Sequence, residues 1–264
     1  MIVRKAAREI AKRLYPVAGE DAELEASFLL RALGFHSPYQ TVSETDAEAI
    51  EPLIERRRAG EPLQYVLGEW EFYGLPFYVD RTVLIPRPDT ERIVEIGERF
   101  LSDERRDVLD LCCGSGCIGI ALAVRCDAAV TAADISADAL ALTERNARRN
   151  GVTVKTVQSD FLDSVEGTFD LIVCNPPYLS REEMDARDAS LRYEPEEALY
   201  GGEDGLMFYR RLKAQYRGFL KPGGLLLIEI GMNRKDAVEA MFPNAECFTD
   251  YGGRPRVIAV RNDD

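Results

Sequence analysis

The tetrapeptide Asn175-Pro176-Pro177-Tyr178 combines residue types that can hold and align a planar nitrogen group. It follows the apolar run 169–174, which predicts a buried strand. A rigid turn is the simpler explanation, because two adjacent prolines fix the backbone and remove donors. In the chemical explanation, an asparagine oxygen and a proline carbonyl accept the two N–H bonds of an amide or exocyclic amino group, and a tyrosine ring stacks on it. Such a site would act mainly by alignment, which can contribute about 7–11 kcal/mol.

Polar side chains end four consecutive predicted strands: Asp110, Asp134, Asp160 and Asn175. Because open α/β sheets bind ligands beyond the carboxyl ends of their strands, we expect these side chains to share one site. A carboxylate at Asp134 can accept both hydroxyls of a ribose. Asp160 can contact an adenine amino group or cap the next turn, and Phe161 can pack on the base.

The turn after the first of these strands is rich in glycine. Gly114, Gly116 and Gly119 match G-x-G-x-x-G, which fits a dinucleotide turn, a nucleoside turn or a tight turn packed on a helix. A dinucleotide would place its pyrophosphate at the helix N-terminus, where Asp110 and Asp160 would oppose it. S-adenosylmethionine has no phosphate and carries a sulfonium and an ammonium group. The acidic strand ends therefore favour S-adenosylmethionine over NAD.

Short apolar runs that alternate with helical patterns must position these residues. The runs that predict strands are 107–112, 128–133, 153–157, 168–174, 224–230 and 255–261. We expect a turn at residues 221–224 to lead into the fifth strand. The early strand–helix–strand spacing predicts right-handed parallel crossovers, and hence a doubly wound α/β sheet.

The first part of the chain has a different pattern, with apolar residues at helical spacing. A second helical segment, which includes Leu24, begins at Asp21, and Ser43 with Asp46 forms a predicted capping box. Aromatic and β-branched runs interrupted at Gly74 then predict a β-hairpin, followed by a helix that ends near Leu101. The predicted division is a helical domain at 1–69, a hairpin linker at 70–85 and an α/β domain at 86–264.

The charge of the chain limits its partners. It has 33 Lys and Arg against 46 Asp and Glu, a net charge of −13, which disfavours direct nucleic-acid binding. No apolar run approaches the roughly 18 residues of a membrane span, and no signal-like segment follows Met1, so we expect a cytoplasmic protein without membrane association. Basic residues gather on the first helical segment and at Arg56–Arg58. Solvated helix faces explain them most simply, and a docking surface for an acidic macromolecule is the alternative.

Metal chemistry has little support in the sequence. Six cysteines lie at positions 112, 113, 117, 126, 174 and 247, without a C-x-x-C pair, and the single histidine is His36. We therefore expect free thiols and no metal site.

Several longer motifs resemble those of one enzyme family. They are Glu61-Pro-Leu-Gln-Tyr-Val-Leu-Gly68, Trp70-Glu-Phe-Tyr-Gly-Leu-Pro-Phe77, Leu84-Ile-Pro-Arg-Pro-Asp-Thr-Glu91, Asn175-Pro-Pro-Tyr178, Glu194-Pro-Glu-Glu-Ala-Leu199 and Gly201-Gly-Glu-Asp-Gly-Leu206. This combination resembles the release-factor glutamine methyltransferases, a branch of the class I S-adenosylmethionine-dependent methyltransferases. The segment from Ile85 to Glu91 is similar to the release-factor branch rather than to the ribosomal-protein glutamine methyltransferases.

The resemblance implies a fold, a reaction and a partner. The fold would be a doubly wound, seven-stranded Rossmann-like domain, preceded by a small all-helical domain that contacts the substrate. The substrate would be the glutamine of the Gly-Gly-Gln motif of class I peptide-chain release factors, which act in translation termination, and the product would carry a methyl group on the side-chain amide nitrogen. We expect a monomer.

The resemblance also assigns roles to residues. Asn175, Pro176 and Tyr178 would be catalytic, and together with Pro177 they would bind the substrate. The residues expected to bind S-adenosylmethionine are Asp110, Cys112, Cys113, Gly114, Ser115, Gly116, Asp134, Asp160, Phe161 and Asn175. Cys112 departs from the family pattern, which has a glycine there, so Cys112 must tolerate the backbone angles of that position with a Cβ present.

Three alternatives remain open. A nucleic-acid amino-group methyltransferase uses the same tetrapeptide, but it needs a basic channel and stacking aromatics near its pocket. A methyltransferase fold without catalysis would be a binding protein. An NAD-dependent oxidoreductase would bind NADH and not S-adenosylmethionine.

Overall fold

The computed structural model describes residues 1–101 and 107–262. The chain forms two compact units. The first consists of Met1–Glu69 and Asp188–Tyr193, and the second of Trp70–Arg187 and Glu194–Asp264. The short segment from the second half of the chain is held in the first unit by Tyr193, whose hydroxyl donates to the Ala59 carbonyl at 2.9 Å.

The first unit is helical. Its helices are α1 (Val3–Ala18), α2 (Ala22–Ala32), α3 (Glu44–Arg58) and the short α4 (Leu63–Leu67). The predicted capping box is confirmed at the start of α3: the Ser43 hydroxyl accepts from Asp46 N–H, and the Asp46 carboxylate accepts from Ser43 N–H. Leu24 of α2 is 55% exposed, because the buried face of this helix consists instead of Ala22, Ala26, Leu29 and Leu30.

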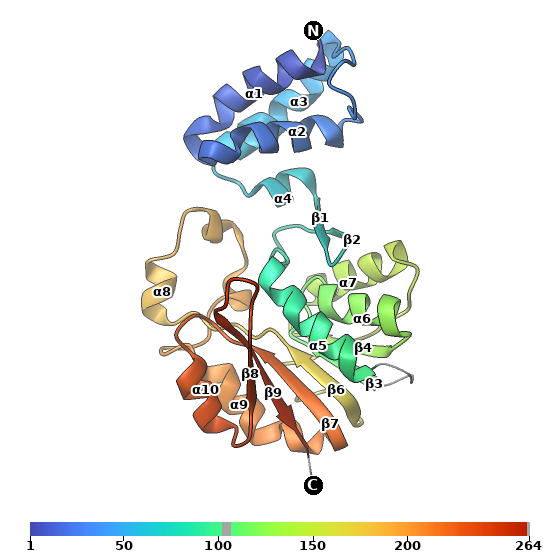
Figure 1. Ribbon diagram of the computed structural model, residues 1–264, viewed down its shortest axis with the longest axis vertical. Helices are drawn as coiled ribbons and strands as arrows, with labels where there is room; N and C mark the ends of the chain where they lie inside the picture. The colour runs from blue at the N-terminus through green and yellow to red at the C-terminus, as the bar shows by residue number, and fades with distance from the viewer. Residues whose placement is uncertain (102–106, 263–264) are drawn as a thin grey trace. The chain divides into compact units, whose positions relative to one another are not determined.

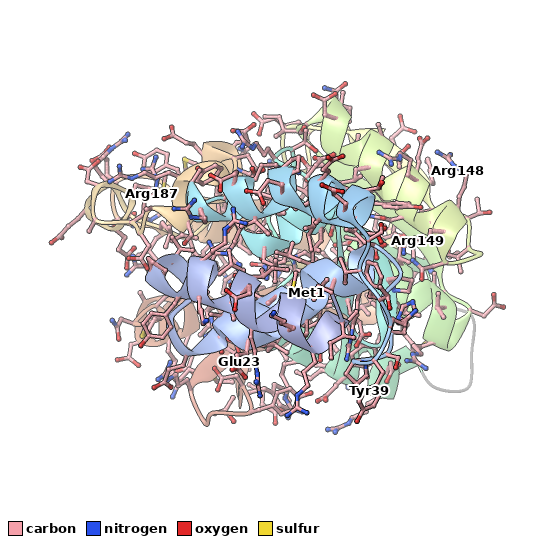
Figure 2. The ribbon with its side chains drawn as sticks, turned by 90° about the horizontal axis from the view of Figure 1, so that it is seen from above. Met1, Glu23, Tyr39, Arg148, Arg149 and Arg187 are labelled. Carbon is pink, nitrogen blue, oxygen red and sulfur yellow. The ribbon has the colours of Figure 1, made fainter. Side chains whose placement is uncertain are left out.

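Ion pairs within this unit account for the arginines at the end of α3. The pairs are Arg56 with Glu61, Arg57 with Glu25, and Arg58 with Glu55. Arg57 and Glu25 are both largely buried, and Arg56 also donates to the carbonyl oxygens of Tyr65 and Val66. These contacts favour a structural role for Arg56–Arg58 over docking. Tyr39, between α2 and α3, is 76% exposed and projects away from the helices (Figure 2).

The β-hairpin begins the second unit. Its strands, β1 (Glu69–Phe72) and β2 (Leu75–Tyr78), are shorter than the predicted region, which continues to Ile85. Phe72 and Phe77 are buried in the core of this unit and meet edge to face. The Asn146 side chain bonds both backbone groups of Tyr78, at 2.7 and 3.1 Å, which ties the hairpin to the α/β layer.

A seven-stranded sheet forms the centre of the second unit. Its strands are β3 (Asp107–Leu111), β4 (Ala129–Asp134), β5 (Lys155–Gln158), β6 (Phe169–Cys174), β7 (Leu220–Glu229), β8 (Glu246–Thr249) and β9 (Pro255–Arg261). The strand order is β5-β4-β3-β6-β7-β9-β8, and β9 runs antiparallel to both of its neighbours. The order reverses between β3 and β6, so the carboxyl ends of these two strands flank the expected ligand crevice.

Helices cover both faces of the sheet (Figure 1). The helices α5 (Glu91–Leu101), α6 (Cys117–Cys126) and α7 (Ala137–Arg149) lie on one face, and α9 (Met207–Gln215) and α10 (Lys235–Met241) on the other. The short α8 (Arg181–Asp185) follows the tetrapeptide. Helix α5 ends at the predicted Leu101. Among the described residues, no helix has the length and apolar character needed to cross a membrane.

Two expectations about the strands were wrong in detail. Lys221–Gly224 is not a separate turn, because β7 already begins at Leu220 and pairs with Phe169. The extra residues form an irregularity in the pairing, with Gly223 at φ +73°. The edge strand β8 is absent from the predicted ranges, since its four residues have no continuous apolar run.

Candidate active site

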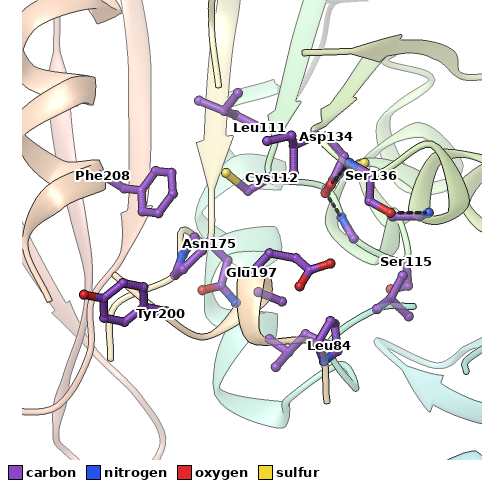
Figure 3. A pocket seen from close by; sticks show the side chains of 18 of the residues that line it. Leu84, Leu111, Cys112, Ser115, Asp134, Ser136, Asn175, Glu197, Tyr200 and Phe208 are labelled. Carbon is purple, nitrogen blue, oxygen red and sulfur yellow. Dashed lines mark hydrogen bonds between the residues drawn. The ribbon is translucent and has the colours of Figure 1, made fainter. Parts of the chain in front are cut away.

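A cavity of about 380 Å³ lies in the second unit at the carboxyl ends of β3, β4 and β6. Its wall includes most of the predicted cofactor residues: Cys112, Cys113, Gly114, Ser115, Asp134, Asp160, Phe161 and Asn175. Pro177 also lines it, whereas Asp110, Gly116, Pro176 and Tyr178 lie outside the wall. Figure 3 shows Asp134 and Ser136 on one side of this cavity and Asn175, Tyr200 and Phe208 on the other.

Asp110 lies beneath the glycine turn rather than in the cavity wall. It is 1% exposed, and its Oδ2 atom accepts the Gly119 N–H at 2.8 Å. Its Oδ1 atom has no hydrogen-bond partner among the described residues. Burial raises the pKa of Asp110 to about 7; the Gly119 N–H opposes this rise, and the charge of Asp134 adds to it. Asp110 therefore supports the turn and the first residues of α6.

Asp134 reaches the opposite side of the same turn. Its Oδ2 atom accepts the Gly114 N–H at 2.9 Å, and its Oδ1 atom accepts the Ser136 N–H at 3.0 Å. Burial raises the pKa of Asp134, against the effect of these two hydrogen bonds. The bonds fix the carboxylate at the cavity, where each oxygen keeps a further lone pair for a ligand hydroxyl.

The two carboxylates decide which ligand charge the turn can accept. Backbone N–H groups at a helix N-terminus ordinarily attract anions. Here Gly119 N–H is bound by Asp110 and Gly114 N–H by Asp134, so carboxylates already take these donors. A pyrophosphate would meet negative charge, whereas a cationic ligand would be favoured. Glu197, which also lines the cavity, adds a further negative charge facing Asp134.

The glycines of the turn serve close packing. A Cβ at Gly116, where φ is +75°, would lie 2.7 Å from Thr143 Cγ2. A Cβ at Gly119 would lie 2.8 Å from Val130 Cγ1 and 2.9 Å from Asp110 Oδ2. These two residues let α6 pack closely on the sheet, and they act on the cavity only through the position of the turn.

Cys112 adopts the glycine-like conformation that the sequence requires of it. Its φ is +59°, in the left-handed region that side chains disfavour, and its thiol projects into the cavity wall (Figure 3). The adjacent Cys174 thiol, followed by burial, raises the pKa of Cys112 well above its usual value. The group is therefore a neutral thiol near pH 7, and a thiol is a much weaker nucleophile than a thiolate.

The end of the cavity beside β5 is aromatic. Phe161 is 4% exposed and packs on Phe208, with ring centroids 5.6 Å apart. Arg211 lies over the Phe161 ring at 5.0 Å and bonds the Asp160 carboxylate at 2.7 Å. The two rings give this end an apolar wall, and Asp160 is exposed at its rim.

The tetrapeptide follows β6 directly and places its members differently. Asn175 lines the cavity, and its Nδ2 atom donates to Thr90 Oγ1 at 3.4 Å. Pro176 and Pro177 are buried. The Tyr178 ring packs against the backbone of Gly231, just beyond the end of β7. Burial raises the pKa of Tyr178, so this residue is an uncharged phenol.

Some site residues were missed by sequence reasoning. The cavity also includes Thr90, Glu197, Tyr200 and Phe208. Thr90 and Glu197 fall within motifs that carried the family resemblance. Those motifs could have pointed to both residues, but they indicated no role for either. For Phe208, on α9, no sequence signal distinguishes a cavity residue from an ordinary core aromatic.

The fold and this cavity define a class of protein. Five parallel strands in the order β5-β4-β3-β6-β7, an antiparallel β9 inserted before β8, and a carboxylate-lined crevice beside β3 and β6 are the features of a class I S-adenosylmethionine-dependent methyltransferase. The family model described as the methyltransferase small domain matches residues 96–192, and the PrmC N-terminal domain matches residues 3–68.

Curated relatives identify the family. The chain is 40% identical to the release factor glutamine methyltransferase of Geobacter sulfurreducens, over 92% of this chain and 90% of the relative. It is 38% identical to that of Moorella thermoacetica over the full length of both chains, and 37% identical to that of Streptococcus pneumoniae over 92% of each. The chain belongs to the release factor glutamine methyltransferase family.

Solved structures share the fold at low identity. A methyltransferase from Pyrococcus furiosus superposes with a TM-score of 0.56 at 18% identity, covering 73% of this chain and 91% of that one. The Thermus thermophilus 16S rRNA N2 G1207 methyltransferase superposes with a TM-score of 0.54 at 20% identity, covering 74% of this chain and 49% of that one.

Proposed function

We propose that this protein transfers a methyl group from S-adenosylmethionine to the side-chain amide nitrogen of the glutamine in the Gly-Gly-Gln motif of class I release factors. The observation that carries the proposal is the position of Asn175-Pro-Pro-Tyr178 at the end of β6, beside a cavity whose turn is bound by carboxylates. Membership of the family supports the choice of substrate.

The residues present fit the methyl donor. Asp134 would receive the ribose hydroxyls, Phe161 and Phe208 would flank the base, and Asp160 would lie near its amino group. The ammonium and sulfonium charges suit a cavity where Asp134 and Glu197 are acidic. S-adenosylmethionine supplies a methyl group on a sulfonium that leaves as a neutral thioether.

Asn175 and Pro176 would hold the acceptor amide. The nitrogen lone pair of a primary amide is delocalised, so this nitrogen is a poor nucleophile. Acceptance of its two N–H bonds by Asn175 Oδ1 and the Pro176 carbonyl would fix the nitrogen with its lone pair facing the methyl group. With the donor bound, an N–C bond would form as its S–C bond breaks, and the nitrogen would then lose one N–H proton to solvent. No strong base is required.

The helical unit would recognise the body of the release factor. A groove on α1 and α2 includes the 63%-exposed Tyr15, and its charged lining residues are Arg4, Lys5, Arg8, Lys12, Glu9, Glu20 and Glu23. The basic side chains all come from α1. With Arg56–Arg58 paired inside the unit, the α1 surface is the better basic docking face. Replacement of Lys5 and Arg8 by glutamate should raise the KM for an intact release factor, while activity on a Gly-Gly-Gln peptide stays unchanged.

We further propose that the protein is a cytoplasmic monomer that does not bind nucleic acid directly. Ribosomal-protein glutamine and nucleic-acid amino groups are the competing acceptors, since the same tetrapeptide geometry can hold either. The test offers labelled S-adenosylmethionine with an intact class I release factor, a ribosomal-protein mixture and an RNA in one reaction. We expect label in the release factor and its loss when the motif glutamine is changed to alanine. Label in the RNA or ribosomal proteins alone would overturn the proposal.

A further inference from the structure

Two buried side chains, Thr90 and Glu229, are linked to Asn175 by hydrogen bonds. Thr90 ends the short helix η2 (Pro88–Thr90) and is 2% exposed. Glu229 ends β7 and is 1% exposed. Thr90 Oγ1 donates to Glu229 Oε2 at 2.6 Å, and it accepts from Asn175 Nδ2 at 3.4 Å. Three segments far apart in the sequence thus form one hydrogen-bonded chain that ends at the cavity.

The direction of these bonds determines which atom of Asn175 faces the cavity. Burial raises the pKa of Glu229 to about 7, and the Thr90 hydroxyl and the charge of Arg256 oppose this rise. In its ionised form the Glu229 carboxylate only accepts hydrogen bonds, so it takes the single proton of the Thr90 hydroxyl. The free lone pairs of that hydroxyl then require a donor, and the Asn175 side chain can offer one only through its Nδ2 atom. The amide oxygen of Asn175 is thereby left for another partner. If the Asn175 carboxamide were rotated by about 180°, its Oδ1 atom would face the Thr90 Oγ1 atom with no proton between them.

The end of β7 at Glu229 has further contacts besides the one with Thr90. Arg256 lies near it and pairs with Asp89 at 3.0 Å and with Asp250 at 3.4 Å. The Tyr209 hydroxyl donates to the Glu229 backbone carbonyl at 3.1 Å. The end of β7 is therefore held by contacts that do not involve Thr90, so removal of the Thr90 hydroxyl need not displace the strand.

We propose that Thr90 and Glu229 are positioning residues, which orient the Asn175 carboxamide so that its oxygen, not its nitrogen, faces the substrate amide. This inference rests on the proposed function, in which that oxygen accepts a substrate N–H. Without the Thr90 hydroxyl, the carboxamide can rotate and present its NH2 group to the substrate NH2 group, where neither can accept. The expected consequence is loss of alignment in the transition state rather than loss of binding.

The test compares Thr90→Val, which keeps the shape and removes the hydroxyl, with Thr90→Ser, which keeps the hydroxyl. In the full-length enzyme, Thr90→Val should lower kcat about 100-fold, the scale of a small misplacement of reacting groups, and leave the KM for the release factor within about threefold. Thr90→Ser should restore most of kcat. Thr156→Val, the same change at a hydroxyl on β5 that bonds Glu144, is the matched control and should have the activity of the unaltered enzyme. Equal kcat for Thr90→Val and the unaltered enzyme would overturn the inference.

A second measurement does not depend on the substrate. In the nuclear magnetic resonance spectrum of the free enzyme, one side-chain N–H proton of Asn175 should show hydrogen-bond protection that Thr90→Val removes and Thr90→Ser retains. If Thr90→Val does not fold, Thr90→Val with Glu229→Gln removes the buried charge and serves in both comparisons. An Asn175 signal that is insensitive to these changes contradicts the inference. Failure of the unaltered enzyme to methylate any release factor, with the Asn175 signal responding as expected, would instead contradict the proposed function alone.

Discussion

The Tyr178 ring lies against the backbone of Gly231, where a Cβ would come within 2.6 Å of Tyr178 Cδ2. Gly231 lies two residues beyond the end of β7, and its N–H donates to the Tyr209 hydroxyl at 3.4 Å. The last residue of the tetrapeptide is therefore located by the strand beside β6, not by its own turn alone.

Gly231→Ala should move Tyr178, because 2.6 Å is shorter than any real contact of a Cβ. We expect kcat to fall about tenfold or more, since Tyr178 belongs to the same tetrapeptide as Asn175 and Pro176, which would hold the acceptor amide, while the Kd for S-adenosylmethionine stays within about threefold. Steady-state kinetics and calorimetry measure the two quantities. Gly218→Ala, at a glycine with open space around the added Cβ, is the control. Equal kcat values for the two variants would contradict the role given to Tyr178.

Asn175→Ala should nearly abolish methyl transfer. Removal of one aligned acceptor is expected to lower kcat about 100- to 1,000-fold, in the range seen when an enzyme loses one transition-state hydrogen bond. The affinity for S-adenosylmethionine should stay within about tenfold, because Asp134 and the glycine turn are intact. Single-turnover assays and equilibrium titration separate these effects. Full activity of the variant would remove Asn175 from the mechanism.

Cys112→Gly should strengthen cofactor binding. The Cys112 thiol occupies part of the cavity wall, so its removal opens space for the ligand. The positive φ, which costs a side-chain residue about 1–2 kcal/mol relative to glycine, affects the free and the bound enzyme alike and therefore stability rather than affinity. We expect the Kd for S-adenosylhomocysteine to fall by about threefold or more. Cys174→Ser, which changes the neighbouring thiol and leaves the Cys112 backbone alone, should have a smaller effect. An unchanged Kd for Cys112→Gly would mean that the side chain does not obstruct the ligand.

Asp110 should make the stability of the cofactor-free enzyme depend on pH. Its pKa rises on folding from 3.8 to about 7, so the folded state binds more protons than the unfolded chain between these values. Asp110 therefore contributes to the free energy of unfolding below about pH 4, and this contribution is lost as the pH rises to about 7. The effect is about 4 kcal/mol at most.

Asp110→Asn keeps an acceptor for Gly119 N–H and removes the titration. The free energy of unfolding of this variant, relative to the unaltered enzyme, should therefore increase from pH 5 to pH 8. Urea unfolding at several pH values measures it. A difference that is constant across this range would show that Asp110 is not a source of the pH dependence.

Features that depend on local pattern and residue type could be predicted from the sequence. Strand-end carboxylates, the glycine turn and the tetrapeptide lie in contiguous segments, and the capping box at Ser43 is a four-residue signal. The contacts behind the site could not be foreseen in this way. Thr90 and Glu229 are 139 residues apart and meet because α5, which follows η2, packs against β7.

The same limit applies to charged residues. Arg56–Arg58 read as a basic surface, but their partners are chosen by how the helices pack, and one of them, Glu25, lies 32 residues from Arg57. A second example is Lys221–Gly224, which includes Gly223. This segment has the composition of a turn, but it is part of β7 because that strand already pairs with β6 at Leu220. Tertiary pairing overrode the local preference there.

The most direct test of the account is the chemical position of the transferred methyl group. An intact class I release factor is incubated with the enzyme and S-adenosylmethionine, and tandem mass spectrometry then locates the added methyl group in the Gly-Gly-Gln peptide. We predict a methyl group on the glutamine side-chain amide nitrogen, formed by the unaltered enzyme and nearly absent with Asn175→Ala. A methyl group on another residue, or an unmodified motif beside methylated RNA, would contradict this prediction.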